Sequence, residues 1–95
     1  MNLIQIITLY KSGQLPANPA VLRSCAEVLE HANDLAFASW RTTSNPVTAK
    51  MLEAEQIRYE KILKHIQGMQ KAISNKAHNR RKAIVQSAAF QHSFQ

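Results

Sequence analysis

The side chains that could perform catalysis or bind a metal are few and are scattered along the chain. It has four histidines, a single cysteine and two glycines, so no phosphate-binding glycine loop can be built and no familiar metal-ligand spacing occurs. Glu27 and His31 lie one helical turn apart, as two metal ligands would, but both fall on the charged face of the helix expected there. Cys25 projects from a different face than His31, so the two cannot form a nucleophile–base pair. We expect no enzymatic activity, no cofactor and no metal.

A basic cluster near the carboxyl end is the other chemically distinctive feature. After Glu60 the chain has seven Lys and Arg residues and no acid. The candidate contact residues there are Lys71, Lys76, Arg80, Arg81 and Lys82. Such cations can displace counterions from a phosphate backbone, or they can contact an acidic protein surface. No aromatic residue is interleaved with them for base stacking, and apolar residues follow directly, which favours protein contact over nucleic acid.

Size and composition restrict what can position these residues. The 95 residues, 45% of them hydrophobic and 19% charged, predict one small domain over residues 1–90 with a loose tail at 91–95. The net charge of +6 comes entirely from the second half of the chain. One cysteine excludes an internal disulfide, and neither a signal peptide nor an apolar run of about 20 residues is evident. We expect a soluble, cytoplasmic chain, and the small core favours a homo-oligomer.

Local sequence signals divide the chain into helices. Gly13 suits the left-handed position that ends a helix, and the dipeptides Asn18-Pro19 and Asn45-Pro46 each combine a favoured N-cap with proline in the first turn. Residues 2–11 are compatible with a helix or a strand, and helix is preferred because no partner strand exists elsewhere. The fold class predicted is all-α.

The first long helix is expected over residues 19–41. Its apolar residues cover a sector of about 200°, wider than the roughly 100° stripe of an ordinary surface helix. This breadth predicts a central helix that is covered from more than one direction. Phe37 and Trp40, near its end, are either part of the core or anchors for a partner; Trp40 is the candidate partner-binding residue.

The second long helix is expected over residues 46–73, followed by a break near Asn75 and a short basic helix. Its apolar residues alternate at spacings of three and four, as in a coiled-coil seam. Glu55 interrupts the seam, either at its wet rim or as a polar residue that selects a partner. The predicted core and self-association residues are Leu52, Glu55, Tyr59, Ile62, Ile66, Met69 and Ile73.

The opening "MNLIQIITLYKSGQLPANPAVL", the all-helical pattern and the basic end together resemble, in general character, the small regulatory proteins of bacteriophages and satellite phages, including the antirepressor type. The resemblance carries no diagnostic motif and assigns no residue roles. It implies a helical regulator that acts by binding a protein such as a repressor. The alternatives are a small nucleic-acid-binding regulator that uses residues 71–82, and a helical chaperone or assembly adaptor.

Overall fold

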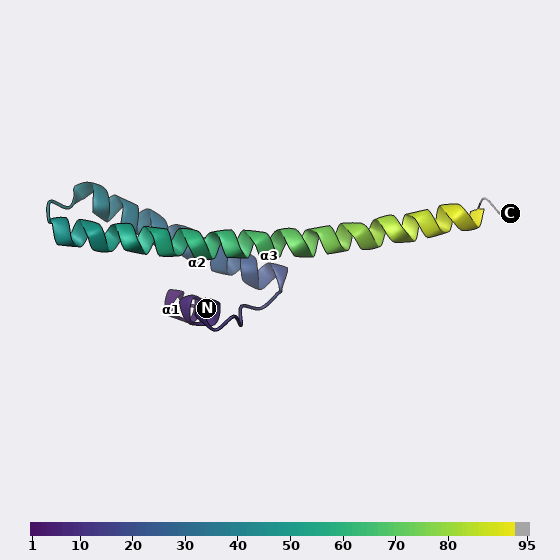
Figure 1. Cartoon of the computed structure of the whole chain (residues 1–95), viewed down its shortest axis with the longest axis horizontal. Helices are drawn as coiled ribbons and strands as arrows, with labels where there is room; N and C mark the ends of the chain where they lie inside the picture. Colours follow the sequence, from purple (N-terminus) through teal and green to yellow (C-terminus); the bar gives the residue numbers. More distant parts are fainter. Residues whose placement is uncertain (93–95) are drawn as a thin grey trace.

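Three helices make up the part of the chain that the structure describes. The computed structural model describes the backbone of residues 1–92 and the side chains of residues 1–77. Helix α1 spans Leu3–Lys11, α2 spans Pro19–Thr42 and α3 spans Pro46–His92. Helices α2 and α3 form an antiparallel hairpin, and α1 lies across one face of it (Figure 1). The predicted all-α class is confirmed.

Helix α1 is specified by hydrogen bonds at both of its ends. The Asn2 side chain accepts from the Gln5 backbone amide at 2.8 Å, and the Gln5 side chain accepts from the Asn2 amide at 2.9 Å. This reciprocal arrangement is a capping box. At the other end Gly13 has φ 69°, and the amides of Gly13 and Gln14 donate to the carbonyls of Tyr10 and Leu9. Such a Schellman ending satisfies the last carbonyls of the helix. The segment that was compatible with a helix or a strand is therefore a helix from Leu3 to Lys11, with Asn2 as its N-cap.

The two Asn-Pro dipeptides begin the two long helices, as predicted. The Asn18 side chain accepts from the amides of Ala20 at 3.0 Å and Val21 at 3.2 Å. The Asn45 side chain accepts from the amide of Val47 at 2.9 Å and, more weakly, from that of Thr48. Each cap satisfies amides that have no partner within the first turn. Only residues 43–45 connect α2 to α3. Because this connection is short, α3 returns along α2.

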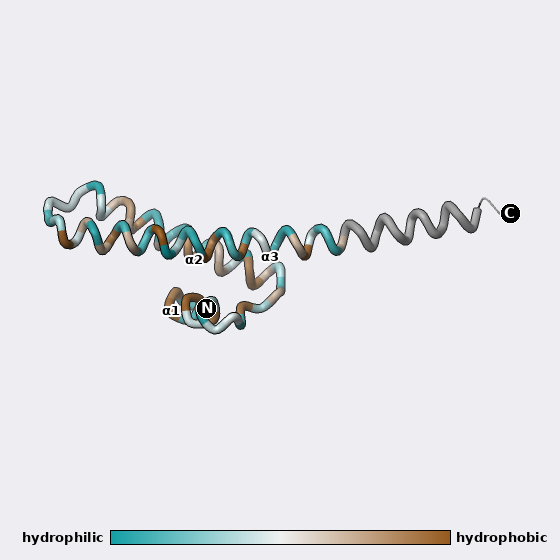
Figure 2. Tube along the Cα trace, viewed as in Figure 1, coloured by the Kyte–Doolittle hydropathy of each residue, from teal (hydrophilic) through white to brown (hydrophobic). Residues whose placement is uncertain are grey.

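The core lies where all three helices meet, a region we call the base. Ile6 of α1, Leu22 and Leu29 of α2, and Ile62 and Ile66 of α3 have no exposed surface. Hydrophobic residues are frequent in α1, and hydrophobic and hydrophilic residues alternate along α2 and along the coloured part of α3 (Figure 2). Because α1 is short, it covers only part of the hairpin, and the hairpin tip around the α2–α3 loop has two helices alone.

Helix α3 corrects the predicted break near Asn75. The helix continues through Ser74–Asn79 without interruption to His92. This segment contains neither proline nor glycine, and its poor helix formers each cost only a few tenths of a kcal/mol relative to Ala. The basic segment is therefore continuous with the second long helix. Of the predicted loose tail, Gln91 and His92 belong to α3, and residues 93–95 lie outside the described part of the chain.

The predicted central position of α2 is correct for only half of the helix. At the base, Leu22, Cys25 and Leu29 are at most 1% exposed. Toward the tip, Leu35 is 57%, Phe37 46% and Trp40 38% exposed. The interpretation of Phe37 and Trp40 as core residues is wrong. The physical reason is that α3 alone faces this part of α2, and one neighbouring helix cannot cover a sector of that width.

Candidate protein-binding site at the hairpin tip

Exposed apolar side chains gather at the hairpin tip. Of the eight large hydrophobic side chains with substantial exposure among the described residues, six lie within residues 35–57. These six are Leu35, Phe37, Trp40, Val47, Met51 and Ile57. Three of them, Phe37, Trp40 and Ile57, line one cleft. Single exposed apolar residues are normal on a protein surface, whereas apolar side chains exposed side by side mark an interaction surface. We therefore treat the tip as the candidate site.

Two aromatic rings form the centre of the tip. The rings of Phe37 and Trp40 stack with centroids 5.9 Å apart and planes inclined by 28°. The guanidinium carbon of Arg41 lies 5.8 Å from the Phe37 centroid, within the range of a cation–π contact. The Trp40 indole Nε1 donates to Oε1 of Glu53 at 3.0 Å, which ties α2 to α3. These contacts hold the aromatic side chains in place although they remain exposed.

A shallow open cleft runs beside these rings, between α2 and α3. It is lined by Phe37, Trp40, Glu53, Gln56, Ile57 and Glu60. Its lining includes two aromatic rings and one aliphatic side chain, and α3 contributes two carboxylates. A cleft of this kind offers area and charge to another macromolecule, but it lacks the enclosed shape that holds a small substrate.

The residues predicted for self-association line the interior of the chain. Tyr59, Ile62 and Ile66 are buried, and Leu52, Met69 and Ile73 pack against them as partly buried residues. The seam predicted from their spacing therefore exists, and α1 and α2 of the same chain cover it. Because Leu52, Met69 and Ile73 are only partly buried, a role of this seam in self-association stays a prediction.

Glu55 lies at the edge of the seam and is partly exposed. The position agrees with the predicted wet rim. Burial raises the pKa of the neighbouring Tyr59 phenol, and the Glu55 carboxylate raises it further because two negative charges repel, while Arg58 acts in the opposite direction. Glu55 thus influences the interior of its own chain, and its predicted role in selecting a partner stays a prediction.

The predicted partner-binding residues do not form one cluster. Trp40 lies at the tip, whereas Lys71 and Lys76 are exposed on α3 beyond the base. The side chains of Arg80, Arg81 and Lys82 lie outside the described residues. Glu53 and Ile57 are not among the predicted site residues, although the spacing of Glu53, Ile57 and Glu60 places them on one helical face.

No catalytic arrangement emerges elsewhere in the described residues. Cys25 is buried, and desolvation raises the pKa of its thiol, which opposes the thiolate form that a nucleophile needs. His31 and Glu27 are both exposed. Within the part of the chain that the structure describes, no group of three potential ligands could hold a metal ion.

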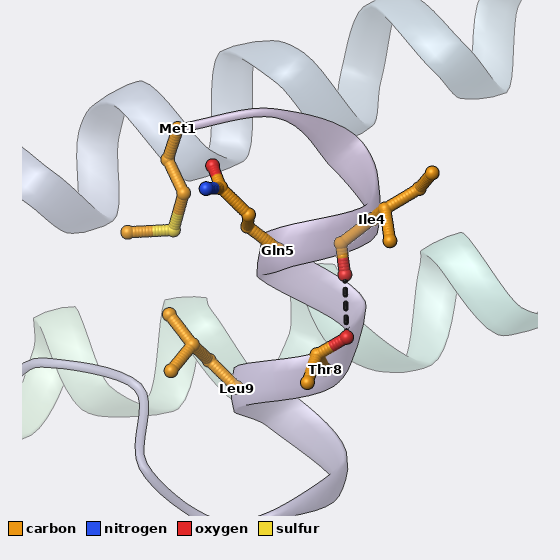
Figure 3. Close-up of a pocket in the computed structure, with 5 residues that line it drawn as sticks. All are labelled: Met1, Ile4, Gln5, Thr8 and Leu9. Carbon is orange, nitrogen blue, oxygen red and sulfur yellow. Dashed lines mark hydrogen bonds between the residues drawn. The ribbon is translucent and has the colours of Figure 1, made fainter.

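A hollow on the outer side of α1 is lined by Met1, Ile4, Gln5, Thr8 and Leu9 (Figure 3). Its one drawn hydrogen bond, from the Thr8 hydroxyl to the Ile4 carbonyl at 2.8 Å, stays within the helix. The hollow contains no ionisable side chain that could orient a ligand. It is a weaker candidate than the tip.

Among the described residues no helix combines the length and the apolar character that a bilayer crossing requires. Comparison of the chain with protein families, with curated proteins and with solved structures finds no significant match. The candidate site therefore depends on the geometry of the tip alone.

Proposed function

We propose that this chain is a small helical regulator that acts by protein–protein binding, with the hairpin tip as its contact surface. The observation that carries the proposal is the exposed, stacked Phe37–Trp40 pair with Ile57 beside it. Aromatic residues and arginine are enriched at protein interfaces, because they bury much area for little loss of side-chain freedom. The tip has this composition.

The charges of the tip favour a protein partner over a nucleic acid at this site. Glu53 and Glu60 line the cleft, and carboxylates repel a phosphate backbone. A protein surface with apolar and basic side chains would meet both the rings and the carboxylates. The regulator would act by occupying a surface that its target requires, as a protein that sequesters a repressor does.

Affinity capture with paired variants tests this function. Wild-type protein should retain a defined cellular protein at moderate salt, and the double variant Phe37→Ala/Trp40→Ala should lose it. Ile4→Ala is the matched control, because Ile4 is 76% exposed on α1 and lies away from the tip. Capture that survives the double variant, or that Ile4→Ala abolishes equally, would contradict a binding site at the tip.

Nucleic acid remains a second candidate partner for a different part of the chain. Lys71 and Lys76 are exposed, and the sequence adds Arg80, Arg81 and Lys82 on the same helix. Retention of DNA or RNA that falls steeply with salt and is lost on Arg80→Glu/Arg81→Glu would support this candidate. Binding that is unaffected by this double variant would exclude the basic segment as the contact.

A further inference from the structure

A second regular stripe of residues lies on α3, on the side away from the core seam. Its members are separated alternately by four and three positions, so they follow one face of the helix. All six are exposed: Glu53, Ile57, Glu60, Lys64, Gln67 and Lys71. We call this set the outer stripe. Its first half is acidic with an exposed isoleucine, 55% accessible, and its second half is basic.

Two copies of the outer stripe have complementary charges when their helices run antiparallel. When two copies of α3 lie antiparallel with Ile57 of one opposite Gln67 of the other, Glu53 faces Lys71 and Glu60 faces Lys64. Each of these opposite-charge pairs then occurs twice, because the arrangement has two-fold symmetry. A parallel arrangement would instead place glutamate against glutamate and lysine against lysine.

We propose that a second copy of this chain docks on the outer stripe in this antiparallel register. The inference rests on the proposed function, since it takes the tip as a protein-contact surface and names one of the proteins that it contacts. The charge complementarity identifies the occupant, because every ionised side chain of the stripe finds an opposite charge in a second copy.

The aromatic cleft is continuous with this interface. Glu53, Ile57 and Glu60 belong both to the cleft and to the acidic half of the outer stripe. Phe37 and Trp40 therefore border the basic half of the second copy. Lysine ammonium groups that lie near aromatic faces gain a cation–π attraction, and their methylene stems can cover the rings. Docking would thus cover the apolar side chains on this side of the tip.

An experiment with reversed charges tests the register directly. Glu53→Lys/Glu60→Lys makes the outer stripe entirely basic, and Lys64→Glu/Lys71→Glu makes it entirely acidic. Sedimentation equilibrium of the wild-type chain should show dimers. Each variant alone should dimerise at least about tenfold more weakly, since opposed like charges destabilise an interface, and an equimolar mixture of the two should form a heterodimer. Circular dichroism confirms that each variant is helical.

Glu27→Lys/Asp34→Lys is the matched control, because it reverses two exposed acids on the outward face of α2. This control should dimerise like the wild type. Fluorescence of Trp40, the only tryptophan, adds a local readout, since docking should shield it from acrylamide. A wild-type chain that is monomeric at all accessible concentrations, dimers that persist in both reversed variants, or a mixture that stays monomeric would each overturn the inference.

The outcome can be separated from that of the proposed function. If the wild-type chain is monomeric but Phe37→Ala/Trp40→Ala still abolishes capture of a different protein, only the antiparallel dimer is wrong. If the dimer forms as described and neither tip variant affects capture, the dimer stands and the tip is not the site for other partners.

Discussion

The base and the tip use the same two long helices with opposite results. At the base, α1 and α3 both contact α2, and Leu22 and Leu29 are completely buried. At the tip α3 is the only neighbour, and Phe37 and Trp40 remain accessible to solvent although they share the breadth of apolar surface that marks α2 as a whole. The local sequences are similarly hydrophobic, so the difference comes from the number of helices that pack there.

This difference separates two roles of hydrophobic residues. Burial of an aliphatic side chain contributes about 1.5–3 kcal/mol to the folded state, and only the base obtains this contribution in full within one chain. At the tip the corresponding free energy is available to whichever molecule covers the surface. The base therefore determines the stability of the chain, and we propose that the tip is the surface through which it associates.

Two isoleucines of α3 provide the largest test of this division. Ile66 is fully buried at the base, whereas Ile57 is 55% exposed at the tip. Ile66→Ala should lower the free energy of unfolding by about 2–5 kcal/mol, through lost burial and the cavity that remains. Ile57→Ala should change it by less than about 0.5 kcal/mol. Urea unfolding at a concentration below that of self-association gives both values, and equal losses would contradict the comparison.

Alanine substitutions at the two glycines compare the turn that follows α1 with the interior of α3. Gly13 has φ 69° in the turn that leaves α1, while Gly68 lies within α3, and an added Cβ would meet no atom within 4 Å at either site. Gly13→Ala should destabilise the chain by about 1–2 kcal/mol, because L-residues are strained in this conformation. Gly68→Ala should stabilise it by up to about 1 kcal/mol through helix propensity. Thermal unfolding followed by circular dichroism distinguishes the two, and shifts of the same sign would contradict the role assigned to the backbone conformation of Gly13.

The smallest expected effect is a pH dependence that belongs mainly to the base. Burial raises the pKa of Cys25 above its ordinary value of 9.0, and burial with help from Glu55 raises that of Tyr59 above 10.0. The folded chain therefore holds these protons more tightly than the unfolded chain does. The contribution of these two groups to the free energy of unfolding is fully present below pH 9.0. It declines as the pH rises through the raised pKa values. Urea unfolding in alkaline buffers should show this decline, and Cys25→Ala should remove its first part. A stability that increased with pH in this range would contradict the assignment.

Much of the fold is predictable from local signals. Asn18 and Asn45 cap the helices that follow them, and Gly13 ends α1, because these functions depend only on residues within one turn. The seam of α3 is predictable from the regular spacing of its apolar residues, which follows the helical period. The capping box of Asn2 and Gln5 was missed, although its i, i+3 pattern stands in the sequence.

The site is less predictable, because it depends on which element packs where. A wide apolar sector on α2 indicates that a cover is required, but it does not reveal that α1 ends before it reaches Phe37. The hydrogen bond between Trp40 and Glu53 likewise depends on the register of the hairpin. The continuation of α3 past Asn75 was also missed, since small propensity differences are outweighed when the flanking residues are already helical.

The burial of Cys25 has a practical consequence for measuring the base. Its thiol is the only one in the chain and is 1% exposed, so an alkylating reagent can reach it only when the packing around it opens. The rate of modification under native conditions therefore counts those openings. Phe37 and Trp40 take no part in covering the thiol. If a ligand that docks on the tip slows the modification, binding at the tip must therefore reduce the opening of the base.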